Sequence, residues 1–223
     1  MRIRLTRRVA IAVLGAALAA PAHAGADAAS ALLDAAGGGD LASVRRLVDA
    51  GAGLEARDGA GRTALLLATR ANYVAIADLL ISAGADVNAK DSQRDTPFLY
   101  AGAEGRDAIL LAILATGRAK LRDTNRYGGT ALIPAAHHGH PETVRILLGT
   151  DIDVDHVNDL GWTALLEAVI LGDGGPVYQE IVGLLVDAGA RPIPDRDGVT
   201  PLQPAERRGY SAIAARIRSG PKG

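Results

Sequence analysis

The triplet Thr63-Ala64-Leu65 recurs along the chain at nearly constant intervals. Related triplets begin at Thr96, Thr130, Thr163 and Thr200, and a weaker copy begins at Ser30. From Ser30 onward the spacings are 33, 33, 34, 33 and 37 residues. A period of this length, repeated along most of a chain, is typical of a solenoid in which each repeat packs against its neighbours. The sequence therefore predicts about six stacked copies of one helix-turn-helix unit.

Each triplet has the features of a helix start. A threonine hydroxyl can accept a hydrogen bond from a free N–H of the first turn, and alanine or proline is well tolerated at the next position. Nine residues after each triplet begins, a residue that tolerates the left-handed conformation is expected to end the first helix. These residues are Gly39, Asn72, Gly105, Gly139, Gly172 and Gly209.

A second helix follows in each copy, because apolar residues recur three and four positions apart. Examples are Ile76, Leu79 and Leu80; Ile109, Ile113 and Leu114; Val144, Leu147 and Leu148; and Ile181, Leu184 and Leu185. Asp58, Asn125, Asn158 and Asp195 then open tight turns that contain glycine. The predicted fold is all-α, with short β-hairpin loops between the helix pairs.

The pattern resembles the ankyrin-repeat family, most closely in residues 84–91 and 195–202. The resemblance runs from about Asp27 to the C-terminus and implies repeats at approximately 27–57, 58–90, 91–124, 125–157, 158–194 and 195–223. It departs from the family where a histidine is usual, since Leu66, Leu99, Ile133, Leu166 and Gln203 occupy those positions. Arg94 replaces a turn glycine, and Asp151-Ile152 replaces Gly-Ala. These departures put in doubt the hydrogen bonds that the histidines make between turns, but not the fold.

The longer fifth copy contains the glycine-rich insertion 172–176 between its two helices. We expect a protruding, flexible loop there. Either it is a recognition element or it is a tolerated insertion, because extra loop length costs little free energy.

Residues 1–24 have the features of a secretory signal peptide. Arg2, Arg4, Arg7 and Arg8 precede an apolar run of about a dozen residues, which is shorter than the roughly 20 of a spanning helix. Ala22-His23-Ala24 provides small residues for cleavage after Ala24. Removing four arginines takes the net charge from -1 to -5. We expect residues 25–223 to form a repeat domain that is periplasmic or secreted, with no membrane association.

The composition excludes several kinds of chemistry. The chain has no cysteine, which rules out disulfides, thiolate metal sites and a cysteine nucleophile. Its charge gives no reason to expect nucleic-acid binding. No phosphate-binding loop or serine-nucleophile motif occurs, and no pair of carboxylates is placed for acid–base work. We therefore expect no catalytic residues and no cofactor.

Histidines gather in one stretch at His137, His138 and His140, with His156 in the next turn. Such a cluster can bind zinc or copper in an exported protein. The alternative is a structural or surface role, because adjacent residues on a helix point about 100° apart. We favour the structural role and assign no metal ligand.

The resemblance implies that the concave face, made by the hairpin tips and the ends of the first helices, binds a partner protein. Tyrosine, tryptophan and arginine, which are enriched in binding hot spots, occur at these positions, and Trp162 is the only tryptophan. Trp162 is expected either to contact the partner or to pack over the neighbouring hairpin. The resemblance also implies that the protein supports an envelope or oxidative-stress enzyme, and we expect it to be a monomer. The alternative is a secreted effector that binds host proteins. The predicted partner-binding residues are Arg62, Arg70, Arg94, Asp95, Glu104, Tyr127, His137, His138, Leu160, Trp162, Ile170, Leu171, Arg207 and Arg208.

Overall fold

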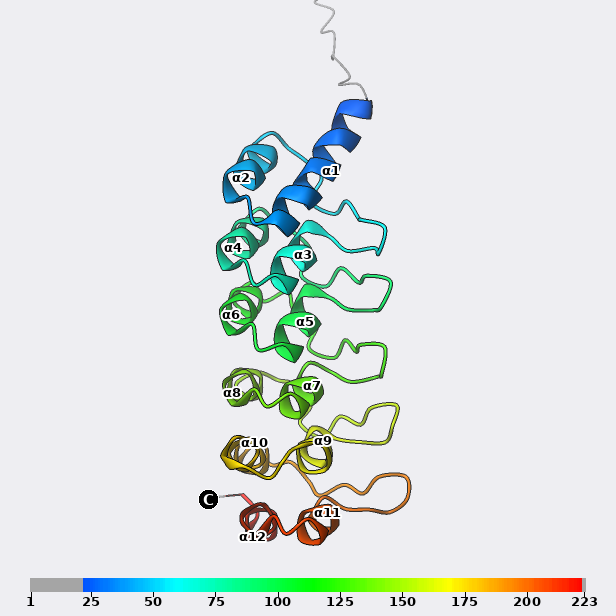
Figure 1. Cartoon of the computed structure of the whole chain (residues 1–223), viewed down its shortest axis with the longest axis vertical. Coiled ribbons are helices and arrows are strands. Elements are labelled where there is room, and N and C mark those ends of the chain that lie inside the picture. Colours follow the sequence, from blue (N-terminus) through cyan, green and yellow to red (C-terminus); the bar gives the residue numbers. More distant parts are fainter. Residues whose placement is uncertain (1–21, 222–223) are drawn as a thin grey trace, which may run out of the picture.

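The computed structural model describes residues 22–221, and these form twelve helices in six consecutive pairs (Figure 1). The first helices of the pairs make one layer and the second helices make another. The first layer consists of α1 (Ala22–Gly38), α3 (Ala64–Arg70), α5 (Pro97–Ala103), α7 (Leu132–His137), α9 (Ala164–Leu171) and α11 (Leu202–Arg207). The second consists of α2 (Leu41–Asp49), α4 (Val74–Ser82), α6 (Asp107–Ala115), α8 (Pro141–Leu148), α10 (Pro176–Asp187) and α12 (Ser211–Ser219). The all-helical repeat solenoid predicted from the period is confirmed.

Each pair packs on the next within both layers, so that α5 contacts α3 and α7 while α6 contacts α4 and α8. The second helices supply buried residues at the predicted positions. Ile109, Leu147 and Ile181 are fully buried, and the neighbouring Leu79 and Leu184 are partly buried and pack against the same core. One continuous apolar core therefore extends through the stack.

Three of the predicted threonine caps are confirmed. The hydroxyls of Thr63, Thr96 and Thr163 accept hydrogen bonds from the backbone N–H three residues on, at 3.3, 3.0 and 3.2 Å. Thr130 and Thr200 do not cap in this way, because α7 and α11 begin later, at Leu132 and Leu202. The prediction for Ser30 is wrong, since it lies inside the 17-residue α1 rather than at a helix start.

The predicted left-handed helix ends are present at five of the six positions, from Asn72 (φ 58°) to Gly39 (φ 81°). Gly172 is the exception, with φ −70° and ψ 163°. The insertion that follows carries the chain away in an extended conformation, and the left-handed residue there is Gly174, with φ 76°.

The insertion at 172–176 does not protrude as expected, because two tyrosines hold it against the solenoid. Gly172 is buried, and its carbonyl accepts a 3.2 Å hydrogen bond from the Tyr210 hydroxyl. Tyr178 donates a 2.8 Å hydrogen bond to the carbonyl of His137 on the preceding repeat. The ring of Tyr210 lies where a Cβ on Gly174 would be, so only glycine fits at that position.

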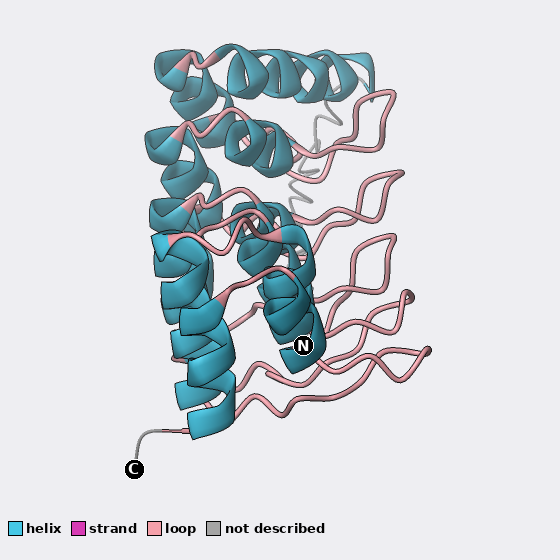
Figure 2. Ribbon diagram, turned by 60° about the horizontal axis from the view of Figure 1, so that its bottom comes forward, coloured by secondary structure: helices cyan, strands magenta, loops and turns pink. Residues whose placement is uncertain are grey.

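The loops between pairs all project on the same side, next to the first-layer helices (Figure 2). They are hairpin-shaped, but no strand is present between residues 22 and 221. Their tips are fixed by an Asp or Asn side chain. Asn125 Oδ1, for example, accepts hydrogen bonds from the N–H groups of Tyr127 and Gly129 at 2.9 and 3.1 Å. Neighbouring tips are joined by backbone hydrogen bonds, such as the 3.0 Å bond from Asp159 N to Tyr127 O.

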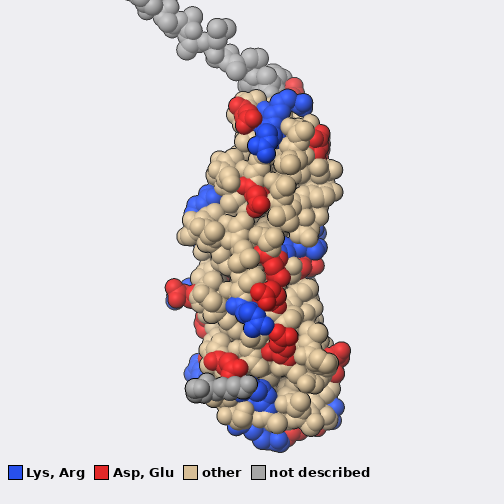
Figure 3. Space-filling view, turned by 90° about the vertical axis from the view of Figure 1, so that its left-hand side faces the viewer, with Lys and Arg blue, Asp and Glu red and all other residues tan. Residues whose placement is uncertain are grey.

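The face formed by the second-layer helices differs from the loop side. Acidic and basic side chains are interspersed along it and separated by uncharged surface (Figure 3). Leu111 on α6 is an exposed apolar residue of this layer, at 52% of its possible surface. A cavity that combines loop and helix residues lies on the loop side instead.

Candidate binding groove

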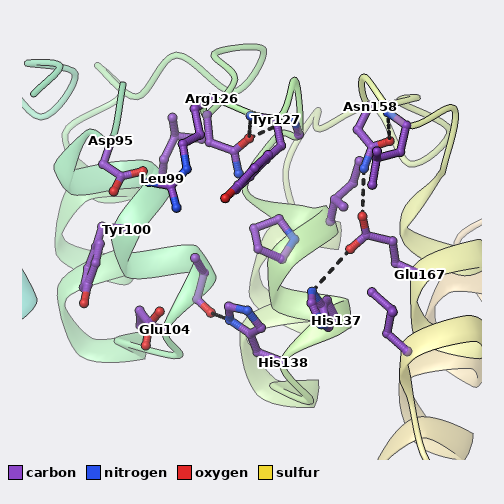
Figure 4. A pocket seen from close by; sticks show the side chains of 17 residues that line it. Asp95, Leu99, Tyr100, Glu104, Arg126, Tyr127, His137, His138, Asn158 and Glu167 are labelled. Atoms are coloured by element: carbon purple, nitrogen blue, oxygen red, sulfur yellow. Dashed lines mark hydrogen bonds and ion pairs between the residues drawn. The ribbon is translucent and has the colours of Figure 1, made fainter. Parts of the chain in front are cut away.

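A cavity of about 480 Å³ lies between the loops and the first-layer helices of the third, fourth and fifth repeats. The loops contribute Asp95, Asn125, Arg126, Tyr127, Gly129, Asn158 and Leu160. The helices and their C-terminal residues contribute Leu99, Tyr100, Ala103, Glu104, Ile133, Pro134, His137, His138, Glu167 and Leu171. We call this cavity the inner groove (Figure 4).

Seven of the predicted partner-binding residues line the inner groove: Asp95, Glu104, Tyr127, His137, His138, Leu160 and Leu171. They come together because each occupies a fixed place relative to the threonine of its repeat, and stacking of the repeats aligns those places. Tyr127 and Leu160 are the most prominent apolar side chains, at 55% and 56% exposure. The groove therefore presents apolar surface that the solenoid itself does not cover.

The other seven predicted residues do not line the groove, and several have partners within the solenoid. Arg62 pairs with Asp58 at 2.7 Å. Arg208 donates to the carbonyls of Val169, at 3.1 Å, and Ile170 near the end of α9. Trp162 is half-buried. The remaining residues of this set are Arg70, Arg94, Ile170 and Arg207.

Arg70 is connected to the groove through two of its lining residues. Its guanidinium lies 4.5 Å from the centre of the Tyr100 ring and 3.9 Å from Asp95 Oδ2. A second guanidinium, that of Arg126, lies over the Tyr127 ring at 4.7 Å and contacts the Gln93 side chain. Two guanidinium groups, those of Arg70 and Arg126, thus lie beside the acidic and aromatic residues at this end of the groove.

Glu167 and Asn158 also line the groove, although neither is among the predicted partner-binding residues. Both are only 6% exposed, and Asn158 Nδ2 donates a 2.7 Å hydrogen bond to Glu167 Oε1. Glu167 Oε2 lies 3.6 Å from His137 Nδ1, which is longer than a hydrogen bond (Figure 4). The sequence does mark Glu167, because it is the single acidic residue in an otherwise apolar helix. It occupies the position that Tyr100 and Pro134 hold in earlier repeats.

Burial dominates the electrostatics of this corner. It raises the pKa of Glu167 to about 7, against the opposing effect of the Asn158 hydrogen bond. Burial also lowers the pKa of His137, and the nearby charge of His138 lowers it further. Asp95 at the other end has its pKa raised, mainly by burial. Near neutral pH, the groove therefore contains a carboxyl group that gains or loses its proton easily.

The histidines are used for contacts between repeats. His138 Nδ1 lies 2.7 Å from the carbonyl of Ala103, and His156 Nε2 lies 2.7 Å from that of Gly128. In the part of the chain that the structure describes, no three His, Cys, Asp or Glu side chains are grouped to hold a metal ion. His138 thus links α7 to the preceding repeat, whereas His156 links the loop after α8 to the loop before α7.

The fold is that of a helical repeat protein: helix pairs are stacked, their loops project on one side, and a groove lies between loops and helices. The ankyrin-repeat family, described as ankyrin repeats in three copies, matches residues 13–91 and 98–193. The chain belongs to this family. Ankyrin repeats serve as protein–protein interaction modules, and ankyrin repeat proteins are typically non-catalytic.

Relatives and solved structures agree with this assignment. The putative ankyrin repeat protein YahD of Escherichia coli K12 is 40% identical over 178 residues, covering 79% of this chain and 88% of YahD. A crystal structure of an ankyrin repeat domain from Acinetobacter baumannii AYE is 53% identical with a TM-score of 0.82, covering 84% of this chain and 96% of that one. The ankyrin repeat domain of Bcl-3 has a TM-score of 0.76 at 29% identity, covering 86% of each chain.

One partial relative is an enzyme. The human NAD-capped RNA hydrolase NUDT12 is 41% identical over 93 residues, which is 19% of its own length and 42% of this chain. The match spans too little of that protein to carry its activity to this chain. Between residues 22 and 221, none of the helices has the length and apolar character needed to cross a membrane.

Proposed function

We propose that the protein is a non-catalytic interaction module of the periplasm, which binds a partner protein through the inner groove and the loop tips. The observation that carries this proposal is the exposure of Tyr127 and Leu160 beside each other on the groove wall, at 55% and 56%. Exposed apolar surface on a soluble protein commonly marks a contact site, and tyrosine is enriched among residues that dominate binding.

The periplasmic location rests on residues 1–24. The predicted signal lies outside the described residues except for Ala22–Ala24, which form the start of α1. Four arginines, a short apolar run and small residues before Gly25 support export. We propose that the partner is a protein of the same compartment, and that the resemblance makes an envelope or oxidative-stress enzyme the first class to examine.

The test is photo-crosslinking from two positions with equal exposure. A photoreactive phenylalanine analogue replaces Tyr127 in the groove or Leu111 on α6, which are 55% and 52% exposed. The proposal expects a specific crosslinked protein from Tyr127 and none from Leu111. Equal crosslinking from both positions, or none from Tyr127, would contradict binding at the groove.

The location is tested on the same cells by fractionation and by the mass of the mature N-terminus. Recovery in the periplasmic extract with cleavage after Ala24 supports the proposal. Recovery in the culture medium supports the alternative of a secreted effector. Full-length protein in the cytoplasm overturns both.

A further inference from the structure

The charges that line the inner groove are unbalanced. Three carboxyl groups line it, namely Asp95, Glu104 and Glu167, against the single guanidinium of Arg126. Arg126 is already engaged with the Gln93 side chain and the Tyr127 ring. Arg70, which does not itself line the groove, lies 3.9 Å from Asp95, so the excess of acid lies with Glu104 and Glu167.

Glu167 is the most buried of these carboxyl groups, at 6% exposure, so it loses the most hydration. Its Oε1 accepts one hydrogen bond from Asn158, while Oε2 has only the 3.6 Å contact to His137. His137 is neutral near pH 7, because burial lowers its pKa. A buried carboxylate with one oxygen poorly paired is destabilised, and a cation placed next to it would remove that cost.

The surroundings of Glu167 also suit the rest of a long cationic side chain. Leu160 and Leu171 line the groove from the same repeat as Glu167, and Ile133 and Pro134 line it from α7. Tyr127 lies on the loop side of His137 (Figure 4). Lysine and arginine have apolar stems that pack on such surfaces, and cations are attracted to tyrosine rings.

We propose that the inner groove anchors a lysine or arginine side chain of the partner polypeptide, with its charged group beside Glu167 and its stem between Tyr127 and the leucines. This inference rests on the proposed function, because it assigns the chemistry of the partner. It predicts a partner segment that is basic at its central residue rather than purely apolar.

The pocket binds this cation better as the pH rises. Deprotonation of Glu167 provides the carboxylate. The titratable group beside it is His137 at the end of α7, at 3.6 Å, whereas His138 and Arg126 line the groove farther from it (Figure 4). Arg208 on α11 is held at the carbonyls of Val169 and Ile170. Burial lowers the pKa of His137, so this ring can only add positive charge at lower pH, which acts in the same direction as protonation of Glu167.

The inference is tested by nuclear magnetic resonance titration of the full chain with single amino-acid derivatives. The probes are Nα-acetyl-lysine and Nα-acetyl-arginine methylamides, with Nα-acetyl-norleucine methylamide as the uncharged control of similar length. At about −0.3 kcal/mol per non-hydrogen atom, ligands of this size are expected to bind with a Kd on the order of 1 mM. We expect saturable shifts of the Tyr127, Leu160 and Glu167 amides with lysine and arginine, and binding of norleucine weaker by about tenfold or more.

Between pH 6 and pH 8 the affinity for the lysine probe should increase about tenfold, following the ionised fraction of a carboxyl group that titrates near 7. Glu167→Gln should abolish this increase and weaken binding, because it keeps the oxygen that accepts from Asn158 but has no charge. The matched control, Glu142→Gln on the exposed surface of α8, should behave as wild type. The amide spectrum of each variant, superimposed on that of wild type away from the groove, shows that it is folded.

Three results would overturn the inference: equal binding of norleucine and lysine, unchanged lysine binding by Glu167→Gln, or no saturable shift at about 50 mM probe. If the probes fail while Tyr127 crosslinks a partner, the proposed function stands and only the cationic anchor is lost. If the probes bind while Tyr127 crosslinks nothing, the anchor chemistry stands and the proposed function fails.

Discussion

Asn158 Nδ2 donates a 2.7 Å hydrogen bond to Glu167 Oε1, while Asn158 Oδ1 accepts from the backbone N–H groups of Leu160 and Trp162 at 3.0 Å. One side chain thus shapes a loop tip and holds the buried carboxyl group of the groove. In repeats where the turn opens with an aspartate instead, as at Asp58 and Asp195, that side chain has no N–H group to donate. The fifth repeat therefore combines a structural turn with a polar site.

The first prediction concerns the pH dependence of stability. Glu167 has its pKa raised from 4.5 to about 7 by burial, so between these values the unfolded chain releases a proton that the native protein keeps. The contribution of this carboxyl to stability is fully present below about pH 4.5 and is lost as the pH rises through 7. Glu167→Gln should remove this loss and be more stable than wild type at pH 8 by about 3 kcal/mol at most.

Urea denaturation of Glu167→Gln and wild type at pH 5 and pH 8 measures this difference. The two proteins should differ less at pH 5 than at pH 8. A constant difference at both values would show that Glu167 does not titrate in this range.

A second prediction separates the two roles of Asn158. Asn158→Asp keeps the oxygen that accepts from the loop N–H groups but replaces the donor to Glu167 with a second carboxylate. We expect a loss of about 1–3 kcal/mol at pH 8 and a smaller loss at pH 5, where Glu167 is largely protonated and the two carboxyl groups repel less. Asn125→Asp, which alters the same turn position one repeat earlier, is the control and should cost less. Similar losses of stability in both variants would show that the cost comes from the turn and not from the lost hydrogen bond to Glu167.

A third prediction concerns the continuous core. Leu80 and Leu147 are fully buried on α4 and α8. Truncation of either to alanine should lower the free energy of unfolding by about 2–5 kcal/mol. Leu111→Ala, at an exposed position of the same layer, should cost less than about 0.5 kcal/mol. Thermal or urea unfolding checks all three, and equal costs would contradict the assignment of the core.

A fourth prediction concerns the turn at Arg94, which replaces the glycine of other repeats and has φ 66°. A side chain in this left-handed region costs free energy that glycine avoids. Arg94→Gly should therefore stabilise the protein by about 0.5–1 kcal/mol. Ser92→Gly in the same turn, where φ is not positive, should be neutral or destabilising. Stabilisation by both variants would indicate a general loosening of the loop.

The fold was predictable because its information is local and repeated. Each Thr-Ala/Pro-Leu triplet specifies the start of a helix, and copies about 33 residues apart specify the stack. Two errors occur where one copy differs from the rest, while the failed caps at Thr130 and Thr200 occur in copies that keep the triplet. Ser30 was assigned by register although nothing before it stops α1, and Gly172 was assigned by register although the insertion changes its conformation.

The candidate site was predictable only in part. Register placed Tyr127, Leu160 and His137 on the inner face, but it does not show which side chains enclose a cavity. That depends on neighbours such as Pro134 and Glu167, whose positions follow from packing between repeats. Arg208 was predicted to contact a partner, but its guanidinium instead donates hydrogen bonds to carbonyls near the end of α9.

The most direct test of the account is the affinity of the crosslinked partner for groove variants, measured by calorimetry. Tyr127→Ala should weaken binding by about 2 kcal/mol or more with little change in unfolding free energy, and Leu111→Ala should leave the affinity unchanged. Trp162→Ala reports whether that half-buried ring also contacts the partner or only packs within its loop, since packing would lower stability and binding together. Equal affinities of Tyr127→Ala and wild type would contradict the claim that the inner groove is the binding surface.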